Sequence, residues 1–123
     1  MTPEVMADKI KKIIEDRKGK DIEVIPLADK TIITDYFVIA SGSSTTHLRG
    51  MADEVIDELE KEGVKPAGVE GYDTASWILI DFLDVVVHLF QQSEREFYNL
   101  EKLWNGTAAA KRKIDQENSQ EDK

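Results

Sequence analysis

The sequence contains few of the histidine and cysteine side chains that commonly form zinc sites and nucleophilic catalytic sites. The histidines are His47 and His88, and there is no cysteine, which excludes disulfides, thiolate metal ligands and cysteine nucleophiles. A zinc site or a catalytic triad needs further partners at recognisable spacing, and neither histidine has them. His47 falls in the first turn of a predicted helix, and His88 has the pattern of a hydrogen-bonded, half-buried strand residue. We therefore expect no metal site and no cofactor.

A short run of glycine and hydroxyl residues, from Gly42 to Thr46, links a predicted buried strand to a predicted helix. Backbone N–H groups and the helix dipole favour an anion at such a point. The run is neither a Walker loop nor a dinucleotide-binding motif. A glycine turn followed by a hydroxyl side chain that caps the helix is the more common arrangement, and we prefer that interpretation.

An entry of strand, glycine, serine and helix is also typical of nucleotidyltransferases, which hold two metal ions with carboxylates. Those carboxylates usually lie two residues apart on one strand, so that both side chains reach the same face. The nearest candidates here, Asp81 and Asp84, are three residues apart and flank a turn. This spacing disfavours metal-dependent group transfer, which we keep as the alternative function.

Residues 70–101 combine large aromatic side chains with an excess of negative charge. Seven acidic residues fall in this range, against one basic residue, Arg95. Tryptophan and tyrosine are common interface anchors, but they are also common core residues. The acidic zone around Trp77 and Tyr98 therefore fits a docking surface for a basic protein and equally an ordinary solvated surface.

The overall composition limits the partners of the chain. Its 123 residues suit one domain with one hydrophobic core. The net charge of −9 opposes nonspecific binding to nucleic acid, which needs a basic footprint, but it suits a basic protein target. No apolar run reaches the roughly 18 residues that span a bilayer, and the N-terminus lacks a signal-peptide pattern. We expect a cytoplasmic protein with no membrane contact and no sequence-specific contact to nucleic acid.

Apolar periodicity predicts three helices. Thr2 and Pro3 begin an amphipathic helix over residues 3–18, and Gly19 lies just past its end. The second helix carries an apolar stripe from Leu48 to Leu59, and Gly63 ends it. A capping box formed by Ser93 and Glu96 opens the last helix, which bears Phe97, Leu100, Leu103 and Trp104.

Five strands are predicted, over residues 21–27, 36–40, 65–70, 77–82 and 85–90. The strand–helix–strand order implies at least one parallel pair, and the short connection at Leu83-Asp84 implies an antiparallel hairpin. The predicted fold class is α/β, with a mixed sheet of about five strands and helices mainly on one face. The last helix is expected either at an edge of the sheet or across its other face, and part of a sheet face could remain open.

The chain divides into a domain over residues 1–106 and a tail over residues 107–123. The tail holds four basic and four acidic residues and no aromatic residue. Such a segment has too little apolar surface to form a core, so we expect a disordered polar tail.

Three segments together resemble the ribosomal silencing factor family (RsfS/Iojap). Residues 34–44, Thr-Asp-Tyr-Phe-Val-Ile-Ala-Ser-Gly-Ser-Ser, resemble the family's central strand and loop, and residues 71–77 and 81–88 resemble its hairpin. Arg95, Tyr98 and residues 100–104 resemble its terminal helix. The likeness covers roughly residues 5–104. One departure is Phe82-Leu83, where many members have a glycine before the aspartate of the turn.

The resemblance implies a nucleotidyltransferase-like fold without catalytic carboxylates. It also implies docking on the large ribosomal subunit through a basic ribosomal protein at the subunit interface, uL fourteen, and a homodimer when free. The docked factor would block joining of the small subunit and so repress translation under nutrient limitation, without enzyme activity. Carried onto this chain, the expected anchors are Trp77 and Tyr98, Arg95 would order neighbouring carboxylates, and the acidic contacts would be Glu70, Asp81, Asp84 and Glu101.

Overall fold

The computed structural model describes residues 1–27 and 34–93. Apart from Ser93, the first residue of the capping box, the predicted last helix and the predicted boundary between domain and tail lie outside these residues. The elements that the structure describes follow the predicted order, and they are α1 (Pro3–Asp16), β1 (Lys20–Pro26), β2 (Tyr36–Gly42), α2 (Thr45–Lys61), β3 (Gly68–Glu70), β4 (Trp77–Asp81) and β5 (Val85–Gln91).

The strands form one mixed sheet in the order β1-β2-β5-β4-β3. The central strands β2 and β5 are parallel, whereas the pairs β1–β2, β4–β5 and β3–β4 are antiparallel. The predicted α/β class, the mixed sheet, the parallel pair and the hairpin are thereby confirmed. Pro26 ends an edge strand, where a residue without an N–H group breaks no ladder. The strand β3 is shorter than predicted, because only Gly68–Glu70 pairs with β4.

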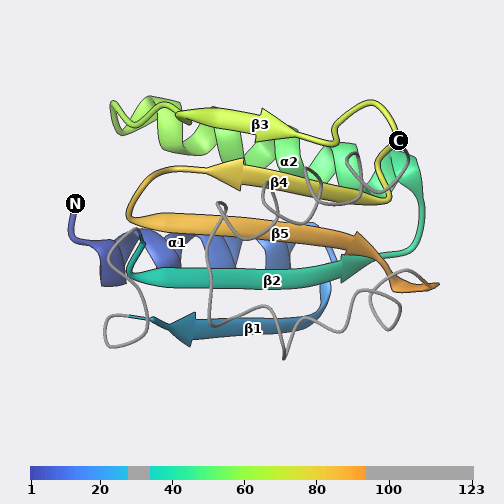
Figure 1. Ribbon diagram of the computed structural model, residues 1–123, viewed down its shortest axis with the longest axis horizontal. Coiled ribbons are helices and arrows are strands. Elements are labelled where there is room, and N and C mark those ends of the chain that lie inside the picture. Colours follow the sequence, from blue (N-terminus) through green and yellow to red (C-terminus); the bar gives the residue numbers. More distant parts are fainter. Residues whose placement is uncertain (28–33, 94–123) are drawn as a thin grey trace, which may run out of the picture.

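Both helices cover the same face of the sheet, as Figure 1 shows. The apolar stripe of α1 packs there together with the stripe of α2. The sheet contributes alternate residues of β2, β4 and β5 to the same cluster, among them Val38, Ile80 and Val87. Since side chains alternate along a strand, the other residues of these strands must point to a second face.

The N-terminus of α1 matches the prediction, whereas its C-terminus differs. Thr2 caps the N-terminus, where its hydroxyl accepts a hydrogen bond from the Val5 N–H, and Pro3 follows. At the C-terminus, Lys18 rather than Gly19 takes the left-handed conformation, with φ of 65°. Gly19 serves a different purpose, because an added Cβ would lie 2.3 Å from Cγ2 of Ile14. Glycine is needed there for close packing.

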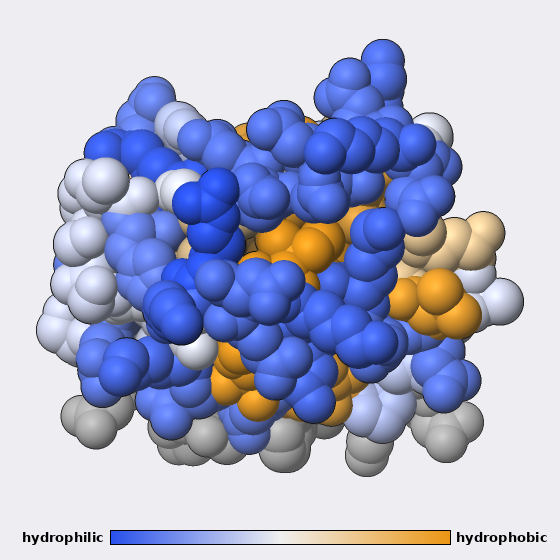
Figure 2. Space-filling model, turned by 180° about the vertical axis from the view of Figure 1, so that it is seen from behind, coloured by the Kyte–Doolittle hydropathy of each residue, from blue (hydrophilic) through white to orange (hydrophobic). Residues whose placement is uncertain are grey.

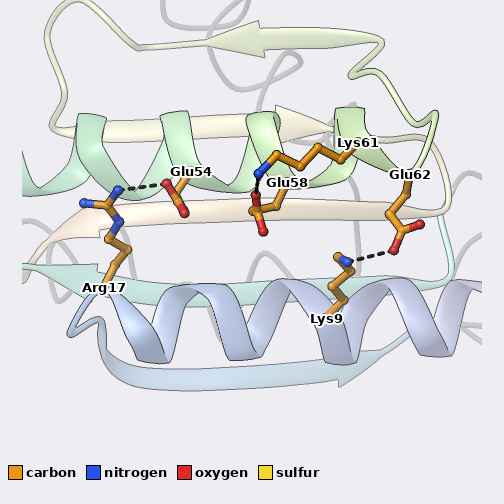
Figure 3. Close-up of polar contacts among 6 residues, drawn as sticks. All are labelled: Lys9, Arg17, Glu54, Glu58, Lys61 and Glu62. Carbon is orange, nitrogen blue, oxygen red and sulfur yellow. Dashed lines mark hydrogen bonds and ion pairs between the residues drawn. The ribbon is translucent and has the colours of Figure 1, made fainter.

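Two ion pairs join the helices across their outer surface (Figure 3). Lys9 pairs with Glu62 at 2.8 Å, and Arg17 pairs with Glu54 at the same distance. Hydrogen bonds in these pairs lower the pKa of Glu62 and raise the pKa of Arg17. Arg17 follows the last residue of α1, and its side chain is exposed. Figure 2 shows this helical surface as mostly hydrophilic, with small hydrophobic areas between the polar side chains.

The second face of the sheet carries its own hydrophobic cluster. It contains Leu27, Phe37, Ile39, Trp77, Leu79, Val86 and Phe90, each at most 5% exposed. These side chains are therefore not part of an open sheet face. They form a compact layer in which aromatic rings contact one another, with Trp77 stacked on Phe90 at a centroid distance of 4.8 Å.

Two glycines offer a test of how tightly the fold is built. Gly71 has φ of 77°, and an added Cβ would lie 2.1 Å from the backbone oxygen of Trp77. We expect Gly71→Ala to lower the free energy of unfolding by at least about 2 kcal/mol. The matched control is Gly50→Ala within α2, where nothing lies within 4 Å of an added Cβ; it should stabilise by about 0.5–1 kcal/mol. Thermal melts of both variants measure the difference, and equal melting temperatures would contradict it.

Candidate functional site

The register of the sheet brings three of the predicted contact residues to the second face. Glu70 lies opposite Leu79, Trp77 opposite Phe90, and Asp81 opposite Val86. Directly opposed residues in a ladder point to the same face. Since Leu79, Phe90 and Val86 belong to the second cluster, Glu70, Trp77 and Asp81 share its face. The predictions for Tyr98, Arg95 and Glu101 lie outside the described residues.

Trp77 and His88 form a polar contact inside this apolar layer. The Nε1–H of Trp77 donates a hydrogen bond to Nδ1 of His88 at 3.1 Å. The His88 ring also meets Phe37 edge-on, with ring centroids 4.5 Å apart. Because Nδ1 accepts, the neutral ring carries its proton on Nε2. The predicted hydrogen-bonded strand histidine is confirmed, but it is 2% exposed and so fully buried instead of half-buried.

The predicted contact residues differ widely in exposure. Trp77 is 5% and Asp81 9% exposed, whereas Asp84 is exposed and Glu70 is half-buried. Asp81 uses Oδ1 to accept a hydrogen bond from the Leu83 N–H at 2.8 Å, so it holds the β4–β5 turn. Burial favours the interpretation of Trp77 as a core residue over that of an exposed anchor. Contact of any of these residues with a partner stays a prediction.

The loop between β3 and β4 is held in place from α2, and sequence analysis missed the residue responsible. The Arg49 guanidinium donates to the backbone oxygens of Tyr72, at 3.0 Å, and Asp73. The Tyr72 hydroxyl in turn donates to Asp53, and this hydrogen bond raises the pKa of Tyr72. Gln91 of β5 donates from its side chain to the Ala75 oxygen. The chain therefore enters β4 at Trp77 along a fixed path.

The loop from Gly42 to Thr46 is a capped helix entry. The Ser44 hydroxyl accepts a hydrogen bond from the His47 N–H at 3.0 Å, which confirms the preferred interpretation. His47 adds a bridge, because Nδ1 accepts from the Ser43 N–H and Nε2 lies 2.7 Å from the Arg17 oxygen. This histidine joins the end of α1 to the start of α2, a structural role.

The described carboxylates do not assemble a metal site. No group of three or more histidine, cysteine, aspartate or glutamate side chains is placed to hold an ion within residues 1–27 and 34–93. Sequence analysis overlooked one pair with the spacing of a nucleotidyltransferase, Asp21 and Glu23 in β1. Both are exposed on an edge strand, and a bulge with φ of 49° at Asp21 interrupts the alternation that would place them on one face.

The fold is that of a small α/β protein, and the second face of its sheet carries a buried apolar cluster. None of the helices described is both long and apolar enough to cross a membrane. A family model for "Ribosomal silencing factor during starvation" matches residues 1–123. The chain belongs to this ribosomal silencing factor family, as its motifs suggested.

Curated relatives and solved structures agree with this assignment. The chain is 38% identical over 96 residues to ribosomal silencing factor RsfS of Bacillus subtilis, covering 78% of this chain and 81% of the relative. It is 41% identical over 91 residues to RsfS of Haemophilus influenzae, covering 74% and 89% of the two chains. A crystal structure of a Chromobacterium violaceum protein is similar with a TM-score of 0.82 at 32% identity, covering 87% of this chain and 89% of that one.

A more distant relative carries a name connected with ribosome assembly. It is "Mitochondrial assembly of ribosomal large subunit protein 1" of Mus musculus, 36% identical over 100 residues. The match covers 79% of this chain but 44% of the mouse protein. The shared part is thus one section of a longer protein.

The Trp77–His88 contact generates a stability prediction. Trp77→Ala should lower the free energy of unfolding by roughly 3–5 kcal/mol, as for a buried aromatic residue. Trp77→Phe keeps a ring against Phe90 but removes the donor to His88 Nδ1, so a smaller loss of roughly 1–3 kcal/mol is expected. Urea unfolding followed by circular dichroism measures both. A Trp77→Ala variant as stable as the wild type would show that the ring is not part of the core.

Proposed function

We propose that this protein docks on the large ribosomal subunit and sterically prevents the small subunit from joining it, which represses translation under nutrient limitation. The observation that carries the proposal is the family match along the chain, together with relatives named as ribosomal silencing factors at 36–41% identity. Their names describe a regulatory role, which fits a protein that acts by occupying space and performs no covalent chemistry.

The partner we propose is a basic protein of the large subunit at the subunit interface, uL fourteen. The chain's charge of −9 supports a basic protein target and opposes direct binding to ribosomal RNA. Within the described part of the proposed surface, Asp84 is exposed and Glu70 is half-buried. Trp77 and Asp81 are buried, so their contribution would be to hold the strands and the turn in place. Tyr98, Arg95 and Glu101 complete the proposed set.

The same proposal includes a cytoplasmic location and a homodimer when the protein is free of the ribosome. Both come from the family resemblance. A dimer that uses the docking surface would compete with the ribosome, whereas a dimer formed elsewhere would not. Sedimentation equilibrium of the purified chain, with and without large subunits, separates these cases.

The alternative is a nucleotidyltransferase-like enzyme with unusual ligands. Among the described residues, one feature in its favour is the helix entry at Gly42–Thr46, which the Ser44 cap explains. Another is the spacing of Asp21 and Glu23, where the β1 bulge interrupts the alternation. A binding measurement with nucleoside triphosphates and magnesium distinguishes the two functions. Saturable nucleotide binding would favour the enzyme.

The central prediction concerns subunit joining. Purified protein in excess over isolated large subunits should co-sediment with them, and it should reduce the fraction of joined ribosomes that form when small subunits are added. Sucrose gradients and light scattering measure this fraction. Small subunits alone serve as the control for nonspecific binding. An unchanged joined fraction, with every large subunit occupied, would refute the steric mechanism.

The charge of the docking surface yields a separate prediction. Asp84→Lys should weaken binding to large subunits by about fivefold at low salt. The defect should shrink at high salt, because added ions screen the reversed charge. The control is Asp57→Lys, which makes the same charge change at an exposed position of α2 on the opposite side of the sheet. Equal effects of the two changes would mean that only net charge matters and that the turn is not at the interface.

A further inference from the structure

The tip of the β4–β5 hairpin exposes a large apolar side chain in an unfavourable backbone conformation. Leu83 is 63% exposed, more than Met1, Val5 or Val69, the other large exposed hydrophobic side chains among the described residues. Its φ is 73°, in the left-handed region that leucine rarely adopts. The Asp84 N–H donates to the Phe82 oxygen at 3.0 Å, closing a three-residue γ-turn centred on Leu83. A central φ near +75° marks the rarer, strained form of this turn.

The other described non-glycine residues at positive φ have local structural reasons for that conformation. Lys18 ends α1, where its N–H donates to the Glu15 oxygen. Asp21 lies in the bulge of β1. Ala75 is fully buried, and its N–H donates to the Gly71 oxygen. Leu83 differs, because its side chain points mostly into solvent and its turn is held by backbone groups and by Asp81.

The turn itself is firmly fixed. The Leu83 N–H donates to Asp81 Oδ1 at 2.8 Å, and the Phe82 N–H donates to the Val85 oxygen at 2.9 Å. The Asp84 oxygen accepts from the N–H groups of Asp35 and Tyr36, at 2.9 and 3.2 Å, which ties the turn to the start of β2. None of these bonds uses the leucine side chain. A glycine would support all of these bonds without strain. The leucine therefore adds backbone strain and contributes little to the stability of the fold.

Strained conformations that the surrounding structure enforces often occur at functional sites. We propose that Leu83 is an apolar contact of the docking surface and inserts into an apolar recess bordered by basic side chains on the partner protein. The exposed carboxylate of Asp84 follows it directly, and Asp35 is bonded to the same turn. An apolar tip beside negative charge complements such a recess. This inference rests on the proposed function and names a residue through which it acts.

The test compares variants at this position, measured as full chains against isolated large subunits. Leu83→Gly and Leu83→Asn both tolerate positive φ, so neither should lower the melting temperature, yet each should weaken binding by about tenfold as the apolar contact is lost. Leu83→Met keeps apolar volume and should bind within about twofold of wild type. The control Val69→Thr changes polarity at another exposed hydrophobic residue and should leave binding unchanged.

The two polar or small variants separate a side-chain role from a backbone role. Glycine also makes the backbone more flexible, whereas asparagine retains a side chain. Weaker binding by both variants would therefore show that the apolar contact of Leu83, and not backbone flexibility, is responsible. Wild-type-like binding of both variants, or a loss in Leu83→Met as large as in Leu83→Asn, would overturn the inference while the proposed function stands. Failure of the wild-type protein to bind large subunits would overturn both.

Discussion

The parallel pairing of β2 with β5 is the constraint on which the rest of this structure depends. Seven residue pairs, from Tyr36–Val85 to Gly42–Gln91, join the two strands at the centre of the sheet. Parallel neighbours cannot be joined by a tight turn, so the chain must cross over between them. Here the crossover contains α2, β3 and β4. The hairpin then returns the chain so that β5 enters between β2 and β4, and the antiparallel strands extend the sheet outward.

Burial of both faces follows from this central pair. The side chains of β5 from Val85 to Phe90 are all buried, whichever face they reach. One face is covered by α1 and α2, and the other holds the aromatic layer of the second cluster. A polar atom buried in such a layer loses its hydrogen bonds to water, and this destabilises the fold unless the atom finds a hydrogen-bond partner within the protein. The Trp77–His88 hydrogen bond meets this need for the indole N–H, and it couples β4 to β5 at a defined position.

The sequence predicted most of this architecture because apolar periodicity reports on it directly. The stripes of α1 and α2 and the apolar runs of β2, β4 and β5 all reflect the side on which a residue is buried. Details that depend on tertiary contact were not predictable in this way. Arg49 looks like any solvated helix residue until β3 and β4 place the backbone of Tyr72 and Asp73 beside it. The bulge at Asp21 likewise has no mark in the sequence, so the relation between Asp21 and Glu23 is clear only from the backbone.

For the predicted site too, the sequence indicates the types of residue present but does not show which of them are exposed. The composition of residues 70–101 identifies an aromatic and acidic zone, but strand alternation decides which members reach solvent. Trp77 and Asp81 point into the second face, where the parallel pair requires burial. Exposed groups of this zone must therefore come from turns and strand edges, where the ladder ends. The β4–β5 turn meets this condition most clearly among the described residues, because Asp81 supports it from below while Leu83 and Asp84 extend into solvent. A buried residue can thus matter for binding without touching the partner, since it fixes the turn that we propose as the contact.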